Sequence, residues 1–339
     1  MTRTTWGDLD ARARGLGTHL LARHQIDSLT AARDVAELTA ALRGAGLTIA
    51  EGTASAAALE LAVRRAAAAQ LRVLERWVGE RAAVLAVVFE DEDRRSLRAL
   101  ARGAVQHAAP EARLSGLIPT PALPERALEE LSRQPSVAAL AALLAVWASP
   151  YAPALRAVAA AAHPDLLHIE LAVNRTFAAR ALAAARRGRS GELVSYVRET
   201  TDLENAMAAL VLAHQGKDMV PKDAFLAGGA RVDVGVFERA VATGDPVAAA
   251  RVLSAALAPA RVARAFAGDA AAIASIEGRL LRLRIAALHA ARRREPLGPA
   301  PLLEYALRLR AQVLDLRRII WSVALAAPQP DLLAALVTT

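Results

Sequence analysis

Pairs of acidic or amide side chains three residues apart are the feature of this sequence whose types and spacing could do chemistry. The pairs are Glu90 with Asp93, Asp202 with Asn205, and Gln312 with Asp315. Two carboxyl groups on one face of a helix could divide the roles of general acid and general base. A catalytic pair needs only one copy, however, so its recurrence favours hydrogen bonding between helices.

A glutamate between aliphatic residues precedes each pair. The three are Glu60 in LELAV, Glu170 in IELAV and Glu277 in IEGRL, and the starts of these stretches lie 107–110 positions apart. Each glutamate is followed 30–35 residues later by its pair. Self-similarity at a fixed period indicates repeated supersecondary units, so the sequence predicts three similar helical units.

The residue types give little support for thiolate, metal-binding or phosphate-binding chemistry. The chain has no cysteine, which excludes thiolate sites and disulfides. No two histidines take the spacing of a metal-binding helix, and His163 with His168 beside Asp165 favours a capping or surface role. The Gly228-Gly229 pair lacks the context of a phosphate loop and predicts a tight turn with positive φ. We therefore expect no catalytic residue, no metal and no cofactor.

Composition favours helices throughout. Hydrophobic residues make up 55% of the 339 residues, much of this alanine, and aromatic residues only 4%. Alanine has the highest helix propensity, and alternating strand patterns are nearly absent. Residues 301–325 carry an apolar seam from Leu302 to Val323, with acidic, amide and arginine side chains opposite. The seam is expected to pack against a similar one from Trp6 to Leu20, and the polar side to face solvent with pairs such as Glu304 and Arg308.

The repeat predicts an all-α fold of three similar units, arranged as a funnel with pseudo-threefold symmetry. The first unit would be closed by both chain ends, residues 1–58 plus 276–339; the second would span 59–168 and the third 169–275. A helical bundle without threefold order is the alternative.

Net charge and hydropathy limit the partners and the cellular compartment that we expect for this protein. The formal net charge is +8, and nearly all the basic residues are arginine, a bias that also suits a GC-rich genome. Without a basic stripe interleaved with aromatics, we expect no nucleic-acid partner. The longest apolar run, 136–150, is too short to span a bilayer and the N-terminus lacks the apolar core of a signal peptide. A cytoplasmic location is expected, with any membrane association made through a partner.

Several stretches together resemble a known family, the central-stalk subunits of V/A-type ATPases that are named C in bacteria and archaea and d in eukaryotes. They are IELAVNRTFAARAL at 169–182, TDLENAMAALVLA at 201–213, AFLAGG at 224–229 and PLGPAPLLEYALRLRAQVLDLRRII at 296–320. Glu170, Asp202, Asn205, Tyr305 and Arg317 match motif positions of that family, whereas Asn174, Phe177, Arg310, Gln312 and Asp315 depart from it.

The resemblance implies a non-catalytic subunit of the central stalk in a rotary ATPase. Such a subunit is a helical funnel that sits on the membrane rotor ring, receives the foot of the rotor axle and transmits torque for ion transport. The axle subunits and the ring are then its expected partners, and its location is peripheral to the membrane through the ring. Arg308, Arg310 and Arg317 are candidates for a partner interface. A free-standing helical-repeat scaffold is the alternative function, and an enzyme with an unrecognised site is a weaker third.

Overall fold

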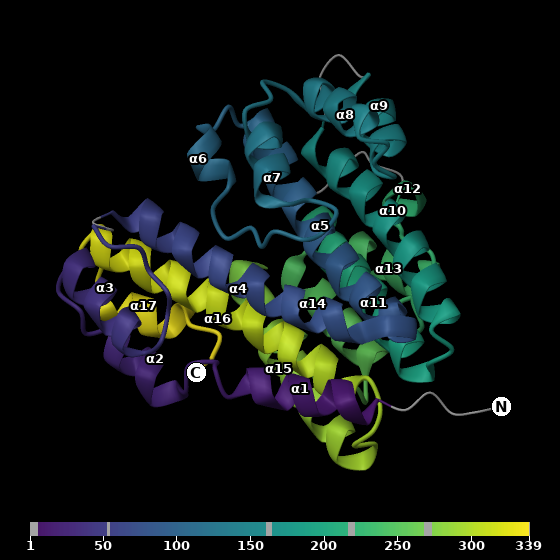
Figure 1. Cartoon of the computed structure of the whole chain (residues 1–339). Helices are drawn as coiled ribbons and strands as arrows, with labels where there is room; N and C mark the ends of the chain where they lie inside the picture. Colours follow the sequence, from purple (N-terminus) through teal and green to yellow (C-terminus); the bar gives the residue numbers. More distant parts are fainter. Residues whose placement is uncertain (1–5, 53–54, 161–164, 216–220, 268–272, 339) are drawn as a thin grey trace. The chain divides into compact units, whose positions relative to one another are not determined.

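The chain is all-helical in the parts that the structure, a computed structural model, describes (Figure 1). These are residues 6–52, 55–160, 165–215, 221–267 and 273–338, and none of them lies in a β-strand. The all-α prediction is confirmed. His163 lies outside the described residues.

Two compact units make up the chain. Unit 1 consists of Met1–Ala82, Ser115–Thr120 and Arg284–Thr339, and unit 2 of Ala83–Leu114 and Pro121–Leu283. Unit 1 is thus assembled from both ends of the chain and one short internal segment. The division into three units and their arrangement as a funnel remain predictions.

Unit 1 is organised around one long helix, α16. Its elements are α1 (Gly7–Gly17), α2 (Arg23–Leu29), α3 (Val35–Gly44), α4 (Ala56–Val78), the 3₁₀ turn η1 (Gly79–Arg81), the C-terminal part of α15 (Ile273–Arg294), α16 (Ala300–Ala324) and α17 (Gln329–Ala335). α16 contacts α1, α2, α3, α4 and α17, and Figure 1 shows it lying along α4. Because five elements pack against it, α16 is the core helix of this unit.

The apolar seam of α16 is buried as predicted except at Ala306 and Val323, which are partly exposed. Leu302, Val313 and Ile320 are at most 1% exposed, and α1 packs against the helix with Trp6 and Leu20 in the core. A helix enclosed by neighbours on several sides buries polar side chains as well as its apolar stripe.

The prediction that the opposite face of α16 is solvated was wrong in part. Glu304, Gln312 and Asp315 are all buried. Glu304 does not pair with Arg308 but with Arg292, at 3.2 Å, and with His289. The physical reason is that the C-terminal turns of α15 pack beside Glu304 and bring His289 and Arg292 within ion-pair distance of its carboxylate.

In unit 2 the helices pack mainly against helices that are near them in the sequence. Its elements are α5 (Ala82–Val105), α6 (Pro110–Arg113), α7 (Glu125–Ser132), α8 (Val137–Val146), α9 (Ala152–Ala159), α10 (Leu166–Arg187), α11 (Gly191–Gln215), α12 (Pro221–Ala224), α13 (Val234–Ala242), α14 (Pro246–Leu257), the 3₁₀ segment η2 (Arg261–Phe266) and the N-terminal part of α15. α11 contacts α10, α13 and α14, and α9 contacts α8 and α10. A core around Phe237, Leu253 and Phe266 joins α11, α13, α14 and η2.

Side-chain caps set many of the helix starts. The residues whose side-chain oxygens accept a backbone N–H of the first turn are Asp34, Ser55, Ser136, Asp165, Asp233 and Asp245. Such caps satisfy N–H groups that have no partner inside the helix. They therefore help to define where these six helices begin.

Ile320→Asp is expected to lower the free energy of unfolding by about 3 kcal/mol or more, because it buries an unpaired carboxylate in the seam of α16. The matched control is Leu325→Asp, at a side chain that is 73% exposed, with an expected cost below about 1 kcal/mol. Urea titration followed by circular dichroism measures both. Equal losses would contradict the assignment of the seam.

Candidate functional site

The pair Gln312 and Asp315 fastens two distant backbone segments of unit 1 to α16. The Gln312 Oε1 accepts the backbone N–H of Leu21 at 2.7 Å. The Asp315 carboxylate, fully buried, accepts the N–H groups of Val337 at 2.7 Å and Thr338 at 2.8 Å, and the Thr338 hydroxyl at 2.7 Å. The pair therefore holds segments from both chain ends.

The corresponding pair in α11, Asp202 and Asn205, does the same within unit 2. Asp202 is 1% exposed and accepts the N–H groups of Ala230, Arg231 and Val232 at 3.0–3.1 Å. The Asn205 side chain accepts the N–H of Leu226 at 2.8 Å and donates to its carbonyl at 2.9 Å. The polar pairs on α11 and α16 thus share one task, which is to bind loop backbone to a helix.

The two glycines of the loop held by Asp202 serve different needs. Gly228 has a φ of +109°, which glycine adopts without strain, so the predicted turn with positive φ is confirmed there. At Gly229 a Cβ would lie 2.2 Å from the Asp202 Oδ1. The second glycine is therefore required by the close approach of a carboxylate.

Glu60 on α4 is a third buried carboxylate that binds a loop. It accepts the N–H of Gly116 at 2.5 Å, the Ser115 hydroxyl at 2.9 Å and the Trp321 indole N–H at 2.6 Å. These contacts tie the short segment Ser115–Thr120 to α4 and α16 inside unit 1. The two glutamates at the corresponding positions of the repeat differ from Glu60. Glu170 lies in an ion-pair network and Glu277 is exposed.

Two of the three arginines considered for a partner interface contact the same segment. Arg310 Nη1 donates to the Gly116 carbonyl at 2.8 Å. Arg317 lies against Gly116, where a Cβ would come within 3.2 Å of its Nη1. Gly116 has a φ of +71°, so both backbone conformation and space favour glycine. A role of these arginines toward partners remains a prediction, and Arg308 lies elsewhere, beside the C-terminal turn of α1.

Unit 2 contains a network of buried ion pairs that the repeat pattern did not predict. Arg94 on α5 is 1% exposed and contacts Asp91 at 2.7 Å and Glu204 on α11 at 2.5 Å. Arg98 joins Glu204, at 3.0 Å, to Glu170 on α10, at 2.6 Å. α5, α10 and α11 are thereby cross-linked by charge.

The sequence held a signal for this network. Six consecutive charged residues, Glu90–Arg95, occupy one stretch of α5. At 100° per residue they point to every side of the helix, so a packed helix must bury some of them. Glu90 accepts the Tyr151 hydroxyl at 2.8 Å and pairs with Arg180 at 2.5 Å, and Asp93 is 5% exposed.

The charges of neighbouring arginines keep the Glu204 carboxyl group ionised. Burial alone would raise its pKa, but attraction to Arg94 and Arg98 and a hydrogen bond from Arg94 lower the pKa to about 2. Burial likewise opposes the charge on Arg94, while Glu204 and Asp91 raise its pKa. Both groups are therefore ionised at neutral pH.

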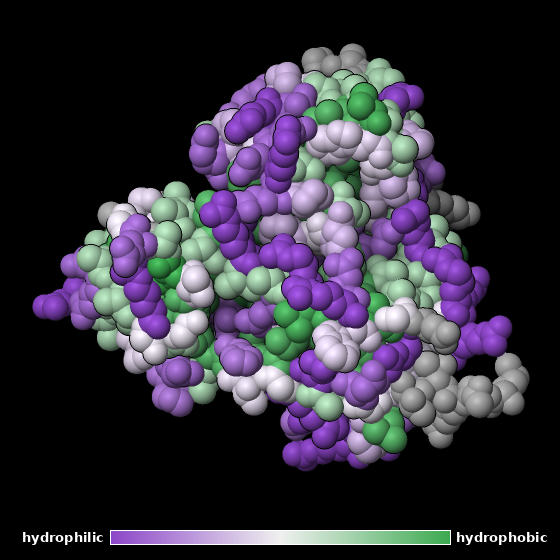
Figure 2. All heavy atoms as spheres, in the orientation of Figure 1, coloured by the Kyte–Doolittle hydropathy of each residue, from purple (hydrophilic) through white to green (hydrophobic). Residues whose placement is uncertain are grey.

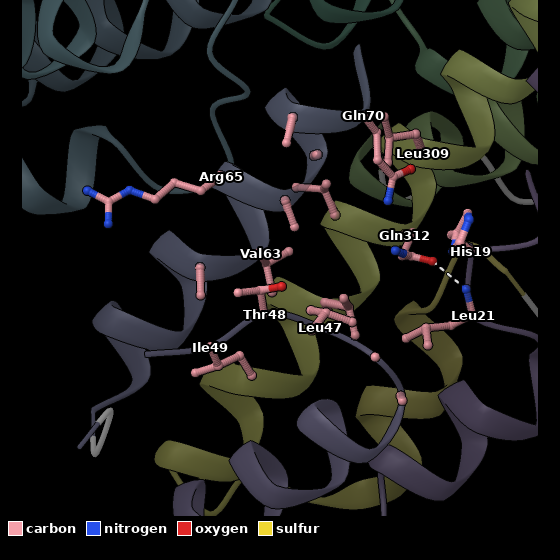
Figure 3. A pocket seen from close by; sticks show the side chains of 18 of the residues that line it. His19, Leu21, Leu47, Thr48, Ile49, Val63, Arg65, Gln70, Leu309 and Gln312 are labelled. Atoms are coloured by element: carbon pink, nitrogen blue, oxygen red, sulfur yellow. Dashed lines mark hydrogen bonds between the residues drawn. The ribbon is translucent and has the colours of Figure 1, made fainter. Parts of the chain in front are cut away.

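A pocket of about 950 Å³ opens in unit 1 between the 45–50 loop, α4 and α16. Figure 3 shows Leu47, Thr48 and Ile49 of the loop near Val63, with Gln312 turned toward the Leu21 backbone and Arg65 extending away from the other labelled side chains. Most of its lining residues are apolar, and the polar ones are Thr18, His19, Gln25, Thr48, Arg65, Gln70, Arg72 and Gln312. Such a lining can receive an apolar side chain by shape, and it offers no nucleophile paired with a base.

Metal binding and membrane crossing find no support in the described residues. Among them, no group of three or more His, Cys, Asp or Glu side chains is placed to hold a metal ion. His168 contacts Asp165 at 2.7 Å, and Asp165 is the N-cap of α10. No helix of the described ranges is long and apolar enough to cross a bilayer, and hydrophilic and apolar residues are interleaved over the face in Figure 2.

Comparison with known proteins gives one match over nearly the whole chain. The family model described as the ATP synthase (C/AC39) subunit matches residues 9–330. No curated protein sequence matches the chain.

Glu204→Gln is expected to destabilise the protein by about 3 kcal/mol at neutral pH, since a pKa lowered from 4.5 to about 2 corresponds to that energy at about 1.4 kcal/mol per unit. The folded-state pKa is depressed, so the stabilisation is present above the unfolded pKa and is lost as pH falls through about 2.

The difference between wild type and variant should therefore narrow below about pH 5, measured by urea titration at a series of pH values. Glu238→Gln on α13, at a half-buried side chain, is the matched control and should show neither effect. A difference that stayed constant with pH would contradict the ion-pair account.

Gly229→Ala is expected to cost about 1–3 kcal/mol, because the new methyl group displaces the Asp202 carboxylate from the loop N–H groups and leaves buried polar atoms unpaired. Gly191→Ala, at the start of α11 where a Cβ meets nothing within 4 Å, should be neutral or slightly stabilising. Thermal unfolding compares them, and equal melting temperatures would disprove the steric argument.

Proposed function

Because the chain belongs to the ATP synthase (C/AC39) subunit family, as its motifs predicted, we propose that it is the non-catalytic central-stalk subunit of a rotary V/A-type ATPase. In this role it links the axle of the soluble, nucleotide-processing sector to the membrane rotor ring and transmits torque for ion transport. The family match over residues 9–330 is the observation that carries the proposal.

The internal contacts support a mechanical role. A subunit that transmits torque has to resist shear between its helices, and ion pairs such as Arg94 with Glu204 join helices at fixed positions. Asp202 and Asp315 hold loops whose movement would otherwise absorb work. These buried polar groups are occupied by one another and by backbone, which leaves them unsuited to bind or activate a substrate.

The two proposed partners differ in the contact they require. The axle foot would enter a concave surface by shape, whereas the ring contact would spread over a polar rim and weaken with salt. The subunit itself would neither bind nor hydrolyse ATP, and its membrane location would come from the ring. The free-standing scaffold remains the alternative, and absence of the chain from a purified rotary complex would favour it.

Removing this subunit from a reconstituted complex should leave ATP hydrolysis by the soluble sector intact and abolish ATP-driven ion pumping, because the chemical and membrane parts would no longer be joined. Hydrolysis and ion flux are measured on the same vesicles, and adding back the purified chain should restore the coupling. Pumping at the normal rate without the subunit, or ATP hydrolysis by the purified chain alone, would disprove the proposal.

A further inference from the structure

A second pocket in unit 1, of about 470 Å³, is lined by an excess of positive charge. It lies between the last turn of α1, the last turn of α15 and the first turns of α16. Four arginines line it, Arg14, Arg292, Arg293 and Arg308, with Glu304 as the carboxylate among the lining residues. We call it the arginine pocket.

The charge of Glu304 is already engaged. Its side chain is 4% exposed and contacts His289 at 3.1 Å and Arg292 at 3.2 Å. Arg14, Arg293 and Arg308 make no ion pair with any residue that the structure describes. Three guanidinium groups that form no ion pair with a described residue therefore give this concave site a positive potential.

Helix dipoles favour the gathering of positive charge at this place. Arg14 and Arg293 lie in the last turns of α1 and α15, where a cation is favoured by the helix dipole. Arg308 lies in the interior of α16, in its third turn, and its Nη1 approaches Gly17 within 3.9 Å of where a Cβ would be. The guanidinium group of Arg308 therefore joins Arg14 at the C-terminal end of α1, and the charges of three helices meet in one concave site.

An exposed apolar side chain lies outside the lining of the arginine pocket but follows its lining residue Pro296 in the chain. Leu297, on the connection between α15 and α16, is 61% exposed although its neighbour Pro296 lines the pocket. Its Cδ2 lies 3.5 Å from where a Cβ of Gly7 would be, and Gly7 is two helical turns from Arg14 on the same face of α1. A free phosphate would use the charge alone, whereas a polypeptide could use both features.

We propose that the arginine pocket is the docking site of an acidic peptide segment of a partner subunit. Aspartate or glutamate side chains of that segment pair with Arg14, Arg293 and Arg308, since guanidinium groups match carboxylates in geometry and charge. An apolar residue of the segment covers Leu297. The inference rests on the proposed function for the existence of partner subunits, and it adds the chemistry by which one of them is recognised.

The test is fluorescence anisotropy with the full-length chain and a short labelled peptide of alternating glutamate and leucine. Wild type should bind the peptide, more weakly as salt rises, and should not bind the same peptide with glutamine in place of glutamate. The double variant Arg14→Gln with Arg308→Gln should bind about tenfold more weakly, since it removes two charge pairs. Leu297→Ser should weaken binding about threefold.

The matched control is Arg186→Gln with Arg187→Gln, which removes the same net charge from exposed positions at the end of α10 and should bind as wild type does. Arg14→Gln alone, at an exposed residue, should bind several-fold more weakly and serves if the double variant unfolds. Equal loss in both double variants, no binding of the acidic peptide, or competition by inorganic pyrophosphate with no effect of Leu297→Ser would overturn the proposal.

The assay uses the chain without its complex, so its failure would leave the coupling proposal untouched. Conversely, if the reconstitution experiment disproved the proposed function, a measured peptide-binding site would still stand. The two outcomes are therefore distinguishable.

Discussion

Buried carboxylates that accept N–H groups from loops are the interaction on which this fold depends. Asp202, Asp315 and Glu60 each sit on a long helix and each bind the backbone of a distant segment. A carboxylate taken out of water is costly unless its oxygens are hydrogen-bonded, and a loop N–H is costly for the same reason. A hydrogen bond between the carboxylate and the loop N–H satisfies both groups. Removing either partner would leave the other buried without a hydrogen bond.

This constraint explains why the connections of an alanine-rich protein are well defined. Small side chains let helices approach closely but offer little shape with which to select one register over another. Polar contacts at fixed positions supply that selection. The ion pairs of Arg94 and Arg98 with Glu204 and Glu170 do so between helices, and the carboxylates do so between helices and loops. The torque transmission proposed above would benefit from both.

The sequence was sufficient for the fold class and for most of the seam of α16, because helix propensity and hydrophobic periodicity are local signals. It was also sufficient to single out Asp202, Asn205 and Asp315. It did not reveal their partners, which lie 21 or more residues away along the chain.

The burial of the polar side of α16 could not be predicted for a related reason. Gln312 accepts a hydrogen bond from Leu21, 291 residues away, and a helix pattern cannot show that another segment covers its polar face. The choice of Arg292 over Arg308 as the partner of Glu304 depends on the packing of α15. Both were decided by tertiary contacts that local propensity does not encode.

The composition of unit 1 from both chain ends and one internal segment has a consequence for how the protein is made. During synthesis the first 82 residues leave the ribosome long before Arg284–Thr339, which supply the central helix α16. Their contacts with α16 cannot form until that helix has been synthesised, while most of unit 2 is already available to fold. A nascent chain that stalls before α16 would therefore lack the helix against which α1, α2, α3 and α4 pack.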